Sequence, residues 1–362
     1  MKKIICFTSN LTGGGAEHQM SVLANLLVER NYNVTVVTYN TLPDHYILDS
    51  RVKRVRLDVD GKKGMVKQLI ISKYFLSVKA DCVISYRSTP NFILLLPLLF
   101  RPFLKAIVSE RNVTINPSTR ERINYNFLYH RANYIVPNSY TQNRYLKKLD
   151  KAWKNRIVTI TNYTDLNEFV PVGCQTSDEV IQIGIFARIF PQKNYVRFCE
   201  MLNLLKKRTK RKFMVHWYGD RREGAFLLGS NHIHALIEEL QISDVLQVHD
   251  AINDVSQMIC NFHAMCLPSL FEGFSNAISE YICCGKVVLC SDVSDNSTMV
   301  KSGINGFLFN PYDVKSMCQA FERFFNLSSS QITEMERNSR RIAEELFDEE
   351  KFIQSYIGLI EG

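Results

Sequence analysis

Short runs of β-branched and apolar residues alternate with helical patterns along the first 170 residues. The apolar runs are nearly continuous, which predicts strands buried on both faces, and the segments between several of them have the spacing of amphipathic helices. This alternation is typical of a parallel sheet covered by helices. The predicted strands are 3–8, 33–38, 52–57, 81–85, 106–109, 134–137 and 156–160, and the predicted helices include 16–30 and 140–149.

The alternation restarts after a polar, turn-rich stretch at 171–179, which we interpret as a linker. The strands predicted beyond it are 180–186, 212–217, 245–248, 264–267 and 286–290, with helices at 195–208 and 275–284. The pattern therefore predicts an α/β protein of two doubly wound, Rossmann-like parallel-sheet domains, 1–170 and 171–346. A last amphipathic helix at 349–360 has no strand after it, so we expect residues 347–362 to pack back on the first domain. Ligands of such sheets bind at the carboxyl ends of the strands, which predicts a site in a central cleft between the domains.

Composition narrows the class of protein. The chain is 46% hydrophobic and 22% charged, as in ordinary globular proteins. Its longest apolar run, 92–100, is interrupted by Pro97 and is far shorter than the roughly 20 residues of a membrane span. The first residues lack the apolar stretch of a signal peptide, and the ten cysteines lie mostly in apolar segments, as reduced cysteines do. We therefore expect a cytoplasmic protein.

The charge is divided unevenly between the two halves. Residues 1–170 carry 25 basic and 12 acidic side chains, whereas residues 171–362 carry 19 and 24. The basic half suggests an anionic partner (a phosphorylated ligand, a nucleic acid or a membrane surface), although a merely soluble basic surface would give the same balance. Segment 61–79 mixes five lysines with apolar residues at partly helical spacing. We predict that it docks on an anionic membrane, with Lys62, Lys63 and Lys67 exposed, and an ordinary core helix with a basic outer face is the alternative.

Three consecutive glycines lie between the first predicted strand and the first predicted helix. Gly13, Gly14 and Gly15 would let the backbone approach an anion at the helix N-terminus, although a plain tight turn would also need them. Because position 18 is His, the spacing of a dinucleotide fingerprint is missing.

A more specific segment runs from Pro268 to Glu280, directly after a buried strand. Ser275 is a plausible N-cap for the helix that follows, and Glu272 precedes this helix while Glu280 lies within it. A carboxylate accepts two hydroxyl protons, so each glutamate could hold the vicinal diol of a sugar or ribose. Two solvent-facing glutamates are the alternative, which the buried strand in front of them disfavours.

Cations and a further carboxylate follow other predicted strands. Arg188 and Lys193 come after the first strand of the second domain, with Pro191 between them, an arrangement that suits a diphosphate. Segment 109–112, which contains Glu110, Arg111 and Asn112, ends a strand of the first domain and could equally be a structural ion pair. Cys260, His263 and Cys266 are evenly spaced but lack a second ligand pair, so no metal site is predicted.

Five features in this order resemble glycosyltransferase family 4, a family of retaining GT-B transferases, between about residues 13 and 309. They are Gly14-Gly15-Ala16-Glu17; Asn162-Tyr163-Thr164-Asp165 with Phe169; Arg188 with Lys193-Asn194; Pro268-Ser269 with Glu272-Gly273-Phe274 and Glu280; and Gly285-Lys286-Val287-Val288.

The resemblance implies a role for each of these residues. Glu280 would hold the nucleotide ribose and Glu272 a donor hydroxyl, while Arg188 and Lys193 neutralise the leaving diphosphate in place of a metal. The remaining donor-binding positions would be Gly14, Gly15, Val248, Gly273, Phe274, Ser275 and Asn276, with backbone groups of 248–253 reading the base. Glu110 would be catalytic, and Glu17, His18, Arg111 and Asn112 would bind the acceptor.

The function so implied is a retaining, metal-independent hexosyl- or N-acetylhexosaminyltransferase. It would move sugar from a nucleotide diphosphate, most simply a UDP-sugar, to a lipid-linked glycan in bacterial polysaccharide, oligosaccharide or lipopolysaccharide synthesis. The enzyme would be peripheral on the inner face of the cytoplasmic membrane and would bind no nucleic acid. The chain departs from the family at Glu110-Arg111, where many relatives have His, at Glu17-His18 and at 295–299. A UDP-sugar 2-epimerase of the same fold, or a silent scaffold subunit, is the alternative.

Overall fold

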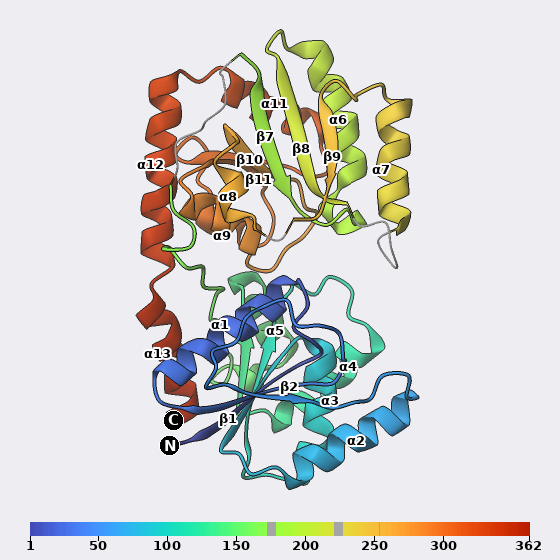
Figure 1. Ribbon diagram of the computed structural model, residues 1–362, viewed down its shortest axis with the longest axis vertical. Helices are drawn as coiled ribbons and strands as arrows, with labels where there is room; N and C mark the ends of the chain where they lie inside the picture. The colour runs from blue at the N-terminus through green and yellow to red at the C-terminus, as the bar shows by residue number, and fades with distance from the viewer. Residues whose placement is uncertain (172–178, 221–226, 253) are drawn as a thin grey trace. The chain divides into compact units, whose positions relative to one another are not determined.

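The computed structural model describes residues 1–171, 179–220, 227–252 and 254–362, and the chain in it forms two compact units (Figure 1). The first unit consists of Met1–Tyr163 and Glu349–Gly362, and the second of Thr164–Asp348. The boundary between the two units therefore falls between Tyr163 and Thr164, seven residues before the boundary predicted at 170/171. Residues 172–178 of the predicted linker lie outside the described residues.

The first unit is built on a six-stranded parallel sheet with the order β3-β2-β1-β4-β5-β6. Its strands are β1 (Lys3–Thr8), β2 (Asn33–Thr38), β3 (Lys53–Arg56), β4 (Cys82–Tyr86), β5 (Lys105–Glu110) and β6 (Tyr134–Pro137). Its helices are α1 (Gly15–Glu29), α2 (Gly64–Ser77), α3 (Ser88–Leu98), α4 (Thr119–Asn126), α5 (Tyr140–Leu149) and α13 (Glu349–Glu361), with 3-10 turns at Leu128–Arg131 and Lys151–Trp153.

The helix α13 belongs to this first unit although it ends the chain. The Tyr356 hydroxyl lies 2.7 Å from that of Tyr86, and both side chains are fully buried. At the start of α13, Glu350 accepts a hydrogen bond of 2.6 Å from Arg30 at the end of α1. Burial of its apolar side therefore fixes α13 against the sheet, as its amphipathic pattern predicts.

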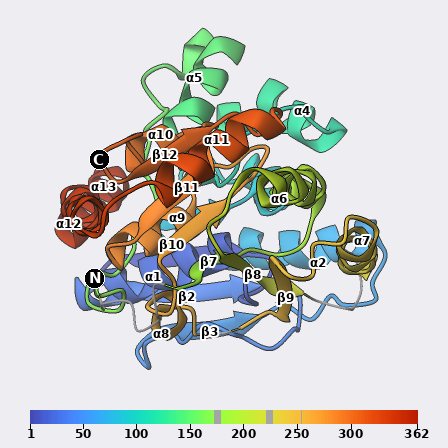
Figure 2. The same cartoon turned by 90° about the horizontal axis from the view of Figure 1, so that it is seen from above.

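The second unit repeats the architecture with the strand order β12-β11-β10-β7-β8-β9, which can be followed in Figure 2. Its strands are β7 (Ile181–Phe186), β8 (Phe213–Asp220), β9 (Leu246–Asp250), β10 (Ala264–Leu267), β11 (Val287–Ser291) and β12 (Gly306–Phe309). Its helices are α6 (Tyr195–Arg208), α7 (Leu227–Glu239), α8 (Ser256–Ile259), α9 (Asn276–Cys283), α10 (Asn296–Met299), α11 (Val314–Phe325) and α12 (Ser329–Leu346), and Pro191–Lys193 forms a 3-10 turn.

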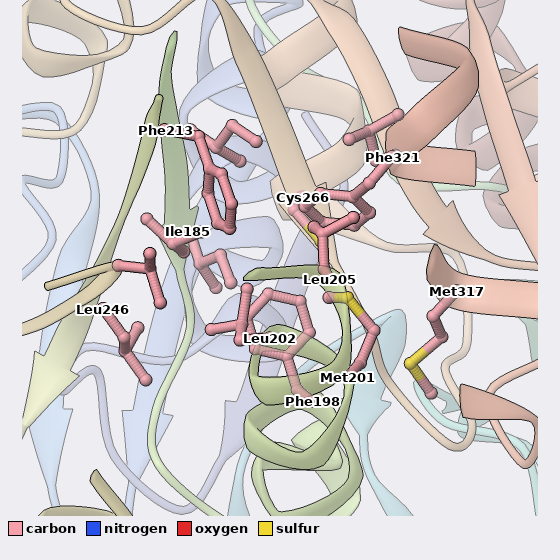
Figure 3. Close-up of a cluster of buried hydrophobic side chains, with 14 of the residues drawn as sticks. Ile185, Phe198, Met201, Leu202, Leu205, Phe213, Leu246, Cys266, Met317 and Phe321 are labelled. Atoms are coloured by element: carbon pink, nitrogen blue, oxygen red, sulfur yellow. The ribbon is translucent and has the colours of Figure 1, made fainter. Parts of the chain in front are cut away.

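One core of this unit lies between the sheet and the helices α6, α7 and α11 (Figure 3). Ile185 of β7 and Phe213 of β8 meet Phe198 and Leu202 of α6 there, and Phe321 of α11 completes the cluster. These side chains are at most 5% exposed, so the core removes nearly all of their apolar surface from water. The sheet is thereby held as a rigid support for the loops at its carboxyl edge.

The predicted pattern of elements is confirmed with two exceptions. Residues 156–160 form no strand, because only Ile157 makes a bridge, to Ile135 of the edge strand β6. The strand β12 was not predicted, since its apolar residues Phe307–Phe309 lie between Asn305-Gly306 and Asn310-Pro311, two pairs typical of turns. The other predicted strands form, with ends shifted by up to three residues.

Candidate functional site

The order of strands in the second unit creates a topological switch point. The strands β7 and β10 are central neighbours, and the chain proceeds outward from β7 to β8 and β9 but in the opposite direction from β10 to β11 and β12. Loops that follow two such strands leave a crevice at the carboxyl edge where ligands bind. Lys193 follows β7 and Glu272 follows β10, so the fold brings the two predicted motifs to this one crevice.

An enclosed ion pair joins the two loops. Lys193 Nζ lies 2.5 Å from Glu272 Oε1, and the two side chains are 16% and 11% exposed. The amide of Leu270 donates to the carbonyl of Gln192, and the Gln192 side-chain amide donates to the carbonyl of Phe271, both at 2.8 Å. Because water is largely excluded, this pair interacts more strongly than an ion pair on the surface.

Arg188 lies in a loop that the neighbouring strand holds in place. The Trp217 indole donates to the carbonyl of Ala187 at 2.7 Å, just before Arg188. Gly219 has φ +151°, and a Cβ there would lie 2.0 Å from the same carbonyl oxygen, so only glycine fits. The Arg188 side chain is exposed, in the same loop after β7 that carries Lys193.

The helix α9 begins where the sequence predicts. The Ser275 hydroxyl accepts a hydrogen bond from the amide of Ile278, which confirms Ser275 as the N-cap. Gly273, Phe274 and Ser275 are buried, and Asn276 is half-buried at the start of the helix.

Ser294 is a contributor that the sequence did not reveal. Its hydroxyl accepts a hydrogen bond of 3.2 Å from the amide of Glu272, and its φ of +53° is unusual for a residue other than glycine. Ser294 comes after β11, the neighbour of β10, so only the strand order brings it to Glu272. No motif in the sequence marks this position.

Glu280 lies in the helix α9, eight residues after Glu272, with its side chain half-buried. In the described part of the chain no group donates a hydrogen bond to its carboxyl. Burial raises the pKa of Glu280 to about 8, and the negative charge of Glu168 adds to the effect. The carboxyl is thus free to accept hydrogen bonds from a diol, and doing so would favour its ionised form.

Val248, the other predicted donor-binding position, is half-buried in β9. Of the backbone segment 248–253 predicted to read a base, residue 253 lies outside the described residues.

The first unit has its own switch point, between β1 and β4. Gly14 is the N-cap of α1, and the Glu17 carboxylate accepts a hydrogen bond of 2.6 Å from Arg87, which follows β4. A Cβ on Gly14 would lie 2.4 Å from Glu17 Oε2, so the glycine makes room for this carboxylate. Glu17 is buried and committed to Arg87, whereas Gly15 is exposed.

His18 packs against an aromatic ring. Its imidazole stacks on Tyr46 with centroids 4.9 Å apart. Burial lowers the pKa of His18 to about 4, and His45 nearby adds to the effect, so the ring is neutral at pH 7. A neutral imidazole can both donate and accept a hydrogen bond.

Glu110, the last residue of β5, and Arg111, which follows it, bind different partners instead of each other. The Glu110 carboxyl is 4% exposed and accepts a hydrogen bond from the buried Tyr129 hydroxyl in the interior of the unit. Arg111 lies over the Tyr86 ring, 4.4 Å from its centroid, and donates to Asn162. The structural ion pair considered as an alternative is therefore not formed. The catalytic role of Glu110 stays a prediction for a carboxyl that is turned away from solvent. Asn112 is exposed.

We expect Glu110→Gln to stabilise the protein at alkaline pH. Burial raises the pKa of Glu110 from 4.5 to about 8, so between these values the native state keeps a proton that the unfolded chain has lost. The free energy of unfolding of the wild type therefore falls as pH rises through this range. The neutral Gln does not titrate, so at alkaline pH the variant avoids this loss, which is on the order of a few kcal/mol. Urea unfolding at pH 5 and 8.5 measures it. The exposed Glu345→Gln is the control, and equal differences from wild type at both pH values would contradict the prediction.

In 1–171, 179–220, 227–252 and 254–362, no three His, Cys, Asp or Glu side chains gather closely enough to hold a metal ion. No helix in the same ranges combines the length and the apolar character that crossing a membrane requires.

The chain has the two-domain α/β fold of GT-B glycosyltransferases. Solved structures with this fold superpose on the whole chain. Sucrose-phosphate synthase from Thermosynechococcus elongatus has a TM-score of 0.87 at 15% identity and covers 100% of this chain and 98% of its own. The Anabaena protein HepE, solved with UDP and glucose, has a TM-score of 0.82 at 16% identity, with 100% of both chains covered.

Sequence comparisons agree with the fold. Residues 175–344 match the family model described as Glycosyl transferases group 1, a segment that lies in the second unit. A Campylobacter jejuni protein, N-acetylgalactosamine-N,N'-diacetylbacillosaminyl-diphospho-undecaprenol 4-alpha-N-acetylgalactosaminyltransferase, is 21% identical over 310 residues, 81% of each chain. These findings support a glycosyltransferase.

Proposed function

We propose that this protein is a retaining glycosyltransferase that needs no metal ion and moves a sugar from a UDP-sugar to a lipid-linked glycan. The Lys193–Glu272 ion pair at the switch point of the second unit is the observation that carries the proposal. It places a cation and a carboxylate where a charged leaving group and a sugar hydroxyl would meet. Arg188 follows the same strand, and Glu280 offers a carboxyl that no described group engages.

In the proposed reaction the bond between the sugar C1 and the diphosphate oxygen breaks, and a bond from C1 to the acceptor oxygen forms on the same face. No enzyme nucleophile takes part, because the acceptor oxygen attacks C1 directly, and the acceptor's proton passes to the departing phosphate oxygen. Lys193 and Arg188 stabilise the charge that develops on the diphosphate. Glu272 accepts from a hydroxyl of the sugar, and Glu280 accepts from the two ribose hydroxyls. Arg111, Asn112 and the α1 residue His18 are proposed to bind the acceptor, whereas Glu17, which is buried against Arg87, is not assigned that role.

The comparisons support the choice of donor and acceptor. The HepE structures are titled as complexes with UDP and glucose, and the C. jejuni relative is named for a diphospho-undecaprenol acceptor. The excess of basic over acidic residues in 1–170 also suits an acceptor carried on an anionic membrane. We infer surface glycan synthesis as the process.

We expect a thermal-shift screen of nucleotide sugars to identify the donor. A ligand at 100 times its Kd adds about 2.7 kcal/mol to the free energy of unfolding, which is a shift of several degrees. UDP and UDP-sugars should raise Tm more than GDP or ADP counterparts at equal concentration, and mass spectrometry of a lipid-linked acceptor should then show an added sugar. A chain that responds to no nucleotide, or that converts a UDP-sugar to its 2-epimer without an acceptor, would contradict the proposal.

A further inference from the structure

The helix α2 exposes an apolar stripe. Met65, Leu69 and Leu76 lie on one side of the helix and are 79%, 64% and 46% exposed, while Ile71 and Phe75 on the other side are buried in the core. From Met65 to Leu76 the stripe is about 17 Å long. An α-helix of a globular protein ordinarily turns polar residues outward, and this stripe departs from that pattern.

A second apolar feature adjoins the C-terminal end of α2. The loop between α3 and β5 exposes Phe100 at 80% and Phe103 at 99%. Arg101 in this loop donates hydrogen bonds of 2.8 and 2.7 Å to the carbonyls of Phe75 and Val78, which ties the loop to α2. The helices α2 and α3 also pack side by side (Figure 1).

Side-chain hydrogen bonds also tie this loop to the rest of the first unit. Arg131 donates to the carbonyls of Leu98, Arg101 and Leu104, with the longest of these hydrogen bonds at 2.7 Å. Its two phenylalanines are therefore presented by a fixed backbone. Two phenylalanine side chains held in water cost hydrophobic free energy that only a partner surface would recover.

The two segments that carry the apolar residues contain basic but no acidic side chains, and the exposed Asp60 and Asp81 flank the first of them. Segments 61–80 and 88–109 contain seven Lys and Arg and no Asp or Glu. Lys62, Lys63, Lys73 and Lys79 are exposed. Lys67 is not, which corrects the sequence prediction: its ammonium bonds Asn40 at 3.3 Å and lies 4.4 Å from the centroid of the Tyr39 ring.

We propose that these residues form a docking face that inserts into an anionic lipid surface. The docking face consists of Met65, Leu69, Leu76, Phe100 and Phe103 with the four exposed lysines. Its apolar side chains would enter the acyl boundary while the lysines remain at the phosphates, the arrangement of an interfacial helix. The four exposed lysines complement anionic headgroups. The inference rests on the proposed function, since the docking face would bring the enzyme to its lipid-linked acceptor.

The test is co-sedimentation of the full chain with vesicles. We expect binding to phosphatidylcholine vesicles containing phosphatidylglycerol and at least tenfold weaker binding to phosphatidylcholine alone. Phe100→Ser with Phe103→Ser should weaken binding to the anionic vesicles by about tenfold or more, because two large apolar side chains no longer insert. Changing Lys62, Lys63, Lys73 and Lys79 to Glu should abolish it, since each lysine contributes about fivefold near an anionic surface. Binding should also fall at 1 M salt, where the Debye length is about 3 Å.

Two control variants test whether binding depends on where these apolar and basic side chains lie or only on how many the protein has. Ile47→Ser removes an apolar side chain that is 87% exposed elsewhere on the first unit, and it should bind as wild type does. Changing the exposed Lys151, Lys154, Lys210 and Lys212 to Glu alters net charge equally and should leave most of the binding.

Three outcomes would overturn the docking face: no vesicle binding by wild type, equal binding by the Phe100/Phe103 variant, or a concentration-dependent dimer that this variant abolishes. The UDP-induced thermal shift distinguishes failure of the docking face from failure of the proposed function. A wild type that binds UDP but no vesicles overturns the docking face alone, and one that binds vesicles but no nucleotide overturns the proposed function alone.

Discussion

Lys193→Ala is expected to lower kcat by about 10²- to 10³-fold, the usual effect of removing a group that stabilises charge in a transition state. The ammonium lies in the crevice after β7, only 16% exposed, so its field acts through little water. Because the diphosphate gains charge as the bond to the sugar breaks, kcat and kcat/KM should fall together. Steady-state kinetics with the donor identified by the thermal-shift screen measures both.

A fall in kcat of Lys193→Ala could also come from the unpaired Glu272 carboxylate that the substitution leaves. Lys193 neutralises Glu272, which is 11% exposed, so the single substitution also leaves a carboxylate without its partner. We therefore compare Lys193→Ala, Glu272→Gln and the double variant. If Lys193 only neutralised Glu272, the double variant would match Glu272→Gln. We expect it to stay about as slow as Lys193→Ala.

The controls address the surface and the metal. Lys207→Ala, an exposed lysine of the helix α6, should retain wild-type kinetics. Because the cations are proposed to act in place of a metal, activity should survive EDTA and should fall steeply in Arg188→Ala as well. Strict dependence on added Mg²⁺ or Mn²⁺ would contradict this part of the proposal.

Glu280→Ala is expected to weaken donor binding by about ten- to a hundredfold while kcat changes less. A hydrogen bond to a charged group is worth roughly 1.5–3 kcal/mol, and a ribose contact is made equally in the ground and transition states. Glu272→Ala, by contrast, should chiefly lower kcat, since Glu272 is proposed to contact the reacting sugar. Isothermal titration with UDP gives the Kd of each variant.

The pH dependence of donor binding tests the same carboxyl. With the pKa of Glu280 raised to about 8, the free protein holds this carboxyl largely protonated at pH 7, whereas the diol needs the carboxylate. Affinity for UDP should therefore rise with pH, up to about tenfold per unit, and level off above pH 8. Glu280→Gln should lack this rise, and the exposed Glu239→Gln should keep it. A flat wild-type profile between pH 6.8 and 8.5 would refute the ribose role.

What the sequence determined is local along the chain. Near-continuous apolar runs separated by helical spacing predicted two parallel sheets, because strands buried on both faces tolerate few polar residues. The N-cap at Ser275 was equally predictable, since the bond that defines it closes within three residues. The sequence also placed three site residues at the carboxyl edge, since the loops that follow predicted strands contain Arg188, Lys193 and Glu272. The strand β12 was missed because its apolar residues lie between Asn305-Gly306 and Asn310-Pro311, two pairs typical of turns.

What the tertiary structure decided is which of these local pieces meet. Lys193 and Glu272 are 79 residues apart, and they pair because β7 and β10 are neighbours, a strand order that no apolar period records. Likewise, Lys67 of the helix α2 turns inward to Tyr39, and Glu110 at the end of the strand β5 turns inward to Tyr129, although charged side chains are ordinarily exposed. Hydrophobic periodicity reports how each segment meets solvent, whereas the partner of a charged side chain is set by packing between segments distant in sequence.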